Sequence, residues 1–114
     1  MNSKESIKGN LRAVIFQILI EKGESYAYEM IQIAKEKTNN GILISEGALY
    51  PVLHKMEAEE LLTSKIKKIE NRKRKYYSLT EEGKKESLVQ IQNIKEFIRQ
   101  LEMIFNPGFK TSLK

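Results

Sequence analysis

The 114-residue sequence predicts one mainly α-helical domain with a small β-hairpin, and three observations support this prediction. Apolar residues recur at helical spacing in four separate segments, whereas strand-like alternation occurs only between residues 62 and 79. The length suits a single compact domain. A composition of 40% hydrophobic and 31% charged residues is typical of globular chains and argues against a disordered or membrane-embedded protein.

Apolar spacing and turn residues predict the first two helices. The first helix carries a stripe at spacings i, i+3, i+4, i+7 and i+8, formed by Leu11, Val14, Ile15, Ile18 and Leu19. Gly23 ends it, and Ser25 is placed to cap a second helix that ends at the turn residues 38–41. The apolar run at 13–20 is far shorter than the roughly 20 residues that span a bilayer, so we expect neither a signal peptide nor a membrane anchor.

A third helix is predicted after a short strand candidate at residues 42–44. Ser45 is placed to cap this helix, whose buried face is formed at helical spacing by Leu49, Val52, Leu53 and Met56. Pro51 conflicts with this prediction, because an interior proline removes a backbone hydrogen bond and clashes with the preceding turn. A helix that begins near Pro51 is the alternative.

The segment from Leu62 to Leu79 alternates like a β-hairpin, with a turn predicted at residues 71–73. Residues 65–75 hold seven basic side chains and one acidic side chain, a net charge of +6, whereas the whole chain carries +5. A basic segment on a nearly neutral body is typical of a contact surface for a polyanion such as nucleic acid. An anionic membrane surface is the competing partner, and a solvated loop is the alternative without a partner.

Thr80 is predicted to cap a long last helix, with Glu81 and Glu82 at its positive end. The apolar residues of this helix are separated by 3, 4, 3 and 4 positions, as in a coiled coil: Ile91, Ile94, Ile98, Leu101 and Phe105. Two heptads fall short of the three or four that identify a coiled coil, so packing within the domain is the alternative to association. Asn106 and Pro107 end the helix, and residues 107–114 are expected to form a flexible tail.

Helices followed by a basic hairpin have the order of a winged helix-turn-helix. We expect residues 1–80 to form this DNA-binding domain and residues 81–106 to form a dimerisation helix. In such a fold the third helix enters the major groove, and the hairpin reaches the adjacent backbone or minor groove. The face of the third helix opposite its buried residues carries Gly47, Tyr50, His54 and Lys55.

Four segments resemble the PadR-like winged-helix transcriptional regulators of bacteria and archaea. They are Tyr-Ala-Tyr-Glu at 26–29, Ser-Glu-Gly-Ala-Leu-Tyr-Pro-Val-Leu at 45–53, Met-Glu-Ala-Glu-Glu-Leu-Leu at 56–62 and the Arg-Lys-Arg-Lys-Tyr-Tyr-Ser-Leu-Thr-Glu-Glu-Gly run at 72–83. The resemblance implies that Pro51 lies inside the third helix. Ala27 and Glu60 depart from it, because the family usually has glycine at both places, and Glu60 replaces a residue favoured for a left-handed backbone.

The resemblance also implies a homodimer that binds double-stranded DNA and releases it when a small hydrophobic or aromatic effector binds. The two-fold symmetry of a dimer predicts an inverted-repeat operator. The absence of cysteine fits a reducing cytosol, so we expect a cytoplasmic protein. Residues assigned to the dimer interface are Leu11, Ile15, Ile91, Ile94, Phe97, Ile98, Leu101 and Phe105. Ile94 and Phe97 are candidates to line an effector cavity, and packing without a ligand is the alternative. The operator, the regulated genes and the effector are not identified by the sequence.

The predicted DNA contacts come from the second helix, the third helix and the hairpin: Tyr28, Ser45, Gly47, Tyr50, His54, Lys55, Arg72, Lys73, Arg74, Lys75 and Tyr77. Basic side chains neutralise phosphates, and tyrosine hydroxyls donate to them without reading sequence. Half-buried packing is the alternative for each tyrosine. Ser45 has two compatible roles, because a helix N-terminus also presents backbone N–H groups to a phosphate.

Catalysis and metal binding find little support. The chain has one histidine and no cysteine, so it lacks the groups for a nucleophile with its base or for a zinc site, and we expect no enzyme, cofactor or metal. The predicted function is a sequence-specific dimeric repressor. The alternative is a winged-helix module that binds a protein through the same face, and single-stranded RNA is disfavoured because the hairpin offers no aromatic stacking platform.

Overall fold

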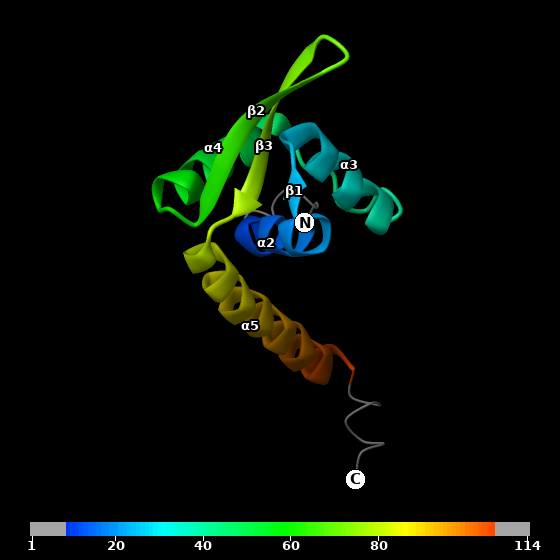
Figure 1. The fold of residues 1–114 in the computed structure, drawn as a ribbon. Helices are drawn as coiled ribbons and strands as arrows, with labels where there is room; N and C mark the ends of the chain where they lie inside the picture. Colours follow the sequence, from blue (N-terminus) through cyan, green and yellow to red (C-terminus); the bar gives the residue numbers. More distant parts are fainter. Residues whose placement is uncertain (1–8, 107–114) are drawn as a thin grey trace.

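The computed structural model describes residues 9–106 and confirms a mainly helical fold with a small antiparallel sheet (Figure 1). Four helices and three strands occur within these residues: α2 (Leu11–Lys22), β1 (Glu24–Ser25), α3 (Ala27–Lys37), α4 (Glu46–Ala58), β2 (Leu62–Ile69), β3 (Arg72–Leu79) and α5 (Glu81–Phe105). The sheet order is β1-β3-β2. The β2–β3 hairpin, called the wing below, extends beyond the helices (Figure 1).

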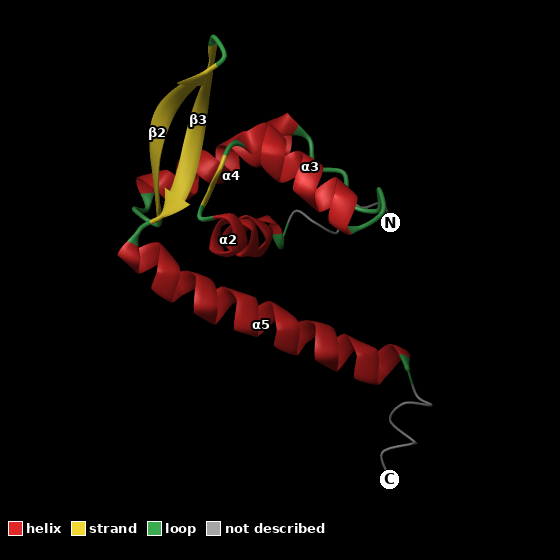
Figure 2. Ribbon diagram, turned by 45° about the vertical axis from the view of Figure 1, so that its right-hand side comes forward, coloured by secondary structure: helices red, strands yellow, loops and turns green. Residues whose placement is uncertain are grey.

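The core forms around α2, which lies between the α3–α4 layer and α5 (Figure 2). Six of its twelve residues are buried, which is more than the predicted stripe, because other elements pack on several sides of the helix. Phe16, Leu53 and Met56 have no exposed surface and join α2 to α4. No helix within residues 9–106 is long and apolar enough to cross a membrane.

The predicted strand at residues 42–44 is wrong. Ile44 is buried in the core, but this segment joins α3 to α4 without pairing with any strand of the described chain. The third strand is instead the two-residue β1, in which Glu24 pairs with Ser78 and Ser25 with Tyr77. Ser25 consequently does not cap α3: it precedes the N-cap residue, and its Oγ donates to Glu29 Oε1 at 2.6 Å.

Helix α4 begins where the sequence predicts. Ser45 is its N-cap, and the Ser45 Oγ accepts a hydrogen bond from the Ala48 N–H at 3.2 Å. Pro51 lies inside the helix, as the resemblance implies, so a start near Pro51 is wrong. The bond that proline omits would go to the carbonyl of Gly47, which is exposed and can be hydrated.

The wing is a regular hairpin whose pairs run from Leu62–Leu79 to Ile69–Arg72. Its turn consists of Glu70 and Asn71, slightly earlier than predicted, and both have positive φ, 50° and 65°. Positive φ at both central residues is the geometry that two-residue hairpin loops favour. Because β1 is so short, the outer half of β3 has no strand on the side opposite β2.

The junction of α4, the wing and α5 is closely packed. Glu60 has φ +63°, so it keeps the left-handed conformation that the family gives to glycine. Thr80 caps α5 as predicted: its Oγ1 accepts from the Gly83 N–H at 2.9 Å and donates to the Glu60 carbonyl at 2.7 Å. The start of α5 is thus hydrogen-bonded to the turn that leaves α4.

Two of the residues assigned to a dimer interface lie in the protomer's own core. Leu11 and Ile15 are 2% and 1% exposed, because α2 runs through the centre of the domain, so their assignment is wrong. On α5, Ile91 packs against the core, and Ile94 and Leu101 are half-buried. The three remaining interface candidates are exposed: Phe97, Ile98 and Phe105. The predicted tail at 107–114 lies outside the described residues.

Candidate nucleic-acid interface

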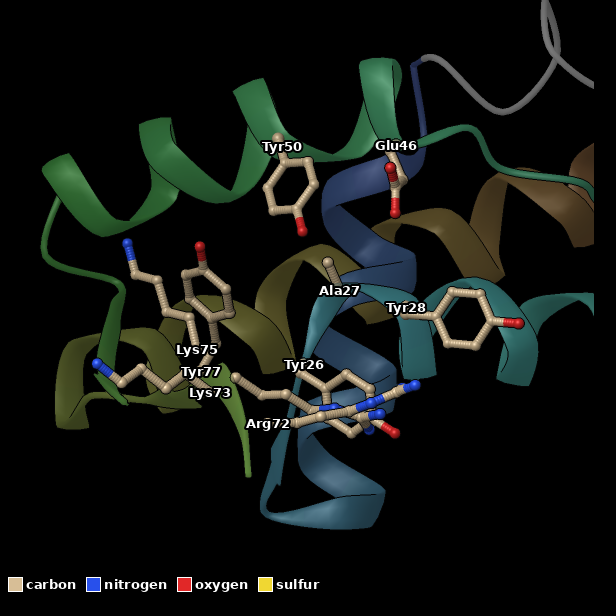
Figure 3. Close-up of a pocket in the computed structure, with 10 residues that line it drawn as sticks. Tyr26, Ala27, Tyr28, Glu46, Tyr50, Arg72, Lys73, Lys75 and Tyr77 are labelled. Carbon is tan, nitrogen blue, oxygen red and sulfur yellow. The ribbon is translucent and has the colours of Figure 1, made fainter. Parts of the chain in front are cut away.

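A groove of about 550 Å³ runs between α4, the beginning of α3 and the outer half of β3 (Figure 3). Its lining is aromatic and basic, with one acidic side chain: Tyr26, Ala27, Tyr28, Glu46, Tyr50, Arg72, Lys73, Arg74, Lys75 and Tyr77. Seven of the eleven predicted DNA contacts line this groove. The groove exists because β1 ends after two residues and leaves the upper part of β3 facing α3.

Helix α4 presents its predicted polar face to solvent. Ser45, Gly47, Tyr50, His54 and Lys55 are all exposed, because the opposite face is anchored in the core. Tyr50 points into the groove (Figure 3), and its ring lies 6.0 Å from the His54 ring. The other four, Ser45, Gly47, His54 and Lys55, do not line the groove.

The side chains of Tyr28 and Tyr77 differ in their exposure to solvent. Tyr28 is 55% exposed at the first turn of α3 and extends away from the wing (Figure 3). Tyr77 has no exposed surface, so its predicted contact with DNA is wrong. Its hydroxyl has no hydrogen-bond partner within the described residues, and burial raises the pKa of Tyr77, which the nearby Lys75 ammonium partly opposes.

The basic residues of the wing divide into two groups. Four are engaged by the protein itself: Lys65 and Lys67 form ion pairs with Glu24, Arg74 lies 4.2 Å from the centre of the Tyr26 ring, and Lys75 pairs with Glu57. The other three form no ion pair within residues 9–106 and are exposed near the tip: Lys68, Arg72 and Lys73. The tip therefore carries the positive charge that is available to a polyanion.

Aromatic and charged contacts fix the base of the wing from the α3 side. The Tyr26 and Tyr76 rings meet edge to face with centroids 5.2 Å apart, and Lys67 lies 4.7 Å from the centre of the Tyr76 ring. The Lys67 ammonium, which donates to Glu24, lowers the pKa of that carboxyl. These contacts hold β3 beside the first turn of α3.

Several residues of this region were not predicted from the sequence. Tyr26, Glu46 and Ala27 line the groove, and Glu57 and Ser64 connect α4 to the wing. Helical spacing could have identified Glu57, because it lies seven residues after Tyr50 and three after His54, on the same side of α4. Tyr26 and Ser64 lack such a signal, since their contacts depend on how α3 and the hairpin meet.

An exposed helix face, a basic hairpin beside it and a long terminal helix define the class of winged-helix transcriptional regulators. Residues 15–88 match the Transcriptional regulator PadR-like family, and the chain belongs to that family. Within this class the structure resembles a transcriptional regulator from Clostridium thermocellum, Cth-833, with TM-score 0.71, 29% identity and coverage of 90% of this chain and 96% of that one.

Two further proteins that resemble this chain are also transcriptional regulators. A PadR family transcription regulator from Clostridium difficile R20291 has TM-score 0.65 and 31% identity, and the match covers 82% of this chain and 95% of that chain. The transcriptional regulator YqjI from Escherichia coli is 34% identical over 94 residues, which are 80% of this chain and 44% of YqjI. The match therefore spans less than half of YqjI.

Proposed function

We propose that this regulator is a dimeric repressor that binds an operator in double-stranded DNA. In this proposal α4 is the recognition helix in the major groove, and the wing tip contacts the adjacent backbone or minor groove. One observation carries the proposal: Tyr50, from the exposed polar face of α4, lines the same groove as Arg72 and Lys73, two unpaired cations of the wing tip. A helix and a hairpin placed in this way suit two adjacent grooves of one duplex.

The exposed apolar side chains of α5 support the dimer. Phe97, Ile98, Ile104 and Phe105 are 53%, 49%, 67% and 75% exposed, although all four are large and hydrophobic. An apolar stripe of this kind on a small chain favours burial against a second surface. A two-fold dimer binds two half-sites about one helical turn apart or a multiple of that, so we expect an inverted-repeat operator.

We also propose that a small hydrophobic or aromatic effector relieves repression by binding near α5. A pocket of about 300 Å³ between the start of α2 and α5 supports this, and both predicted cavity residues, Ile94 and Phe97, line it. Effector relief requires different affinities for the DNA-bound and released forms of the dimer. We therefore expect the regulator to act in the cytoplasm and to have no enzymatic activity.

Fluorescence anisotropy tests the proposal. The chain is titrated at physiological salt against the duplex upstream of its own reading frame, against duplexes that it selects from a random pool, and against a shuffled duplex. We expect a preference of about a thousandfold for one specific duplex over the shuffled one. Equal weak binding to every duplex would mean that the wing binds polyanions without sequence specificity. No binding to any duplex would favour a protein partner for the same face.

A further inference from the structure

We propose that Glu57 is a positioning residue that sets the angle between the wing and the recognition helix, and that Lys75 serves this bridge rather than a DNA phosphate. This inference deepens the proposed function and rests on it. It assigns a role to an acidic side chain that lies at the edge of a basic surface, where a DNA-binding protein gains nothing from negative charge alone.

Glu57 connects three elements. It lies in the last turns of α4, its Oε2 accepts from the Ser64 Oγ of β2 at 2.5 Å, and its Oε1 lies 3.2 Å from the Lys75 Nζ of β3. Ser64 pairs with Tyr77 in the hairpin register, two residues from Lys75 on the same face. One carboxylate therefore holds both strands of the wing to the recognition helix.

The bridge is ionised and partly shielded from water. Glu57 and Lys75 are 32% and 39% exposed. The Ser64 hydroxyl, and then the Lys75 ammonium, lower the pKa of Glu57, while the Glu57 carboxylate raises the pKa of Lys75. An ion pair with an additional hydrogen bond has a defined geometry, and a partly buried one is less screened by salt than a surface pair.

The opposite face of the wing is held independently. There, Glu24 binds Lys65 and Lys67, and the Tyr26 ring contacts Tyr76. Loss of the Glu57 bridge thus leaves the hairpin folded but frees its rotation toward or away from α4. A protein that must contact two grooves at once depends on that angle, because a small displacement of one contact weakens the other.

A competing role for Glu57 makes opposite predictions. If Glu57 only masked Lys75 from DNA, Glu57→Gln would free a phosphate contact, raise affinity for every duplex and steepen the salt dependence by about one unit. If Glu57 positions the wing, the same substitution lowers affinity for the selected duplex and leaves the salt slope unchanged. The glutamine retains an acceptor for Ser64, so the change isolates the charge.

The binding experiment compares Glu57→Gln, Lys75→Met and the double variant with Glu36→Gln as a matched control. Glu36 is exposed on α3, does not line the groove and forms no ion pair within residues 9–106, so its substitution changes the charge equally without breaking a bridge. We expect each bridge variant to lose about tenfold in affinity for the selected duplex and less than about twofold for the shuffled one. The double variant should lose no more than either single variant, because both remove one interaction.

A second measurement needs no DNA. The chain has no cysteine, so spin labels on Ala58→Cys in α4 and Lys68→Cys in the wing report one distance. We expect a narrow distance distribution that broadens in Glu57→Gln and in Lys75→Met and stays narrow in Glu36→Gln. An unchanged distribution overturns the inference, as does a rise in DNA affinity. If no duplex is preferred while the distribution still broadens, the proposed function fails and the positioning role of Glu57 stands.

Discussion

Gly83 in the first turn of α5 lies directly against the backbone of Leu61: a Cβ on Gly83 would be 2.0 Å from the Leu61 carbonyl oxygen. The same carbonyl accepts a hydrogen bond from the Thr80 N–H at 3.1 Å. Gly83 does not have a positive φ, so the position needs glycine because the backbone of Leu61 leaves no room for a side chain. The contact fixes the start of the long helix against the exit from α4.

Gly83→Ala should therefore destabilise the fold, because the methyl group meets backbone atoms that cannot rotate away. We expect the free energy of unfolding to fall by about 3 kcal/mol, which is within the range of overpacking substitutions. Urea denaturation followed by circular dichroism measures the change. Gly47→Ala is the control, since a Cβ at this helical position meets nothing within 4 Å and should stabilise α4 by up to about 1 kcal/mol.

Glu60 has a left-handed backbone that costs a residue with a side chain about 1–2 kcal/mol. The side chain itself is exposed and makes no hydrogen bond or ion pair within residues 9–106. Glu60→Gly should consequently raise the free energy of unfolding by about 1 kcal/mol. In Ala58→Gly, two positions earlier and inside the helix, the same measurement should show a loss of about 1 kcal/mol. A loss in both variants would contradict the strain at Glu60.

Local signals made much of the fold predictable. Ser45 and Thr80 cap helices because a hydroxyl three residues before a free N–H acts within one turn, whatever the rest of the chain does. The two-residue β1 has no periodic pattern, so its pairing with Ser78 and Tyr77 depends on tertiary contacts that the sequence does not display. Leu11 and Ile15 lie on an apolar stripe that looks the same whether a partner or the chain's own α5 covers it.

Tyr77 provides a direct test of the correction to the candidate site. Its hydroxyl is buried without a partner in the described part of the chain, and a polar group in that state costs about 1–3 kcal/mol. Tyr77→Phe should raise the free energy of unfolding by about 1 kcal/mol and leave DNA affinity unchanged. Tyr50→Phe, on the groove wall, should leave stability unchanged and lower affinity. A loss of DNA binding in Tyr77→Phe with no loss of stability would restore the original assignment.

The candidate site was predictable where a helix defined its faces and less so in the wing. On α4, the buried residues fix the opposite side as exposed, which places Tyr50 and His54 correctly. In β3, successive side chains point to opposite faces of the sheet, so Tyr76 and Tyr77 must lie on different faces. The sequence alone does not indicate which of the two faces packs against the core. Because Tyr77 faces inward, Lys75 two residues earlier lies on the same face and pairs with Glu57 instead of remaining exposed.

The proposed dimer would bury the exposed part of α5. Phe97→Glu places a charge within the apolar stripe, and burying that charge at an interface without a partner costs several kcal/mol. Sedimentation equilibrium at micromolar concentration should give a dimer for the wild-type chain and a monomer for Phe97→Glu. Gln92→Glu, an exposed position on the same helix, should remain dimeric. A monomeric wild-type chain would contradict the proposed dimer outright.

We predict that the contribution of each basic residue of the wing to DNA affinity depends on its position in the hairpin and not only on its charge. Arg72 and Lys73 are exposed at the tip without an ion pair within residues 9–106, whereas Lys67 donates to Glu24. Each phosphate contact that is lost should reduce the slope of log affinity against log salt by about one unit.

Arg72→Ala and Lys73→Ala should each lower affinity for the selected and the shuffled duplex alike and reduce the salt slope, which anisotropy titrations at several salt concentrations measure. Lys67→Ala removes the same charge, but its ammonium is already held by Glu24, so the slope should change by much less than one unit. Equal slopes for all three variants would mean that the wing acts through its net charge. Different slopes would locate the phosphate contacts at the tip, where the hairpin extends farthest from the core.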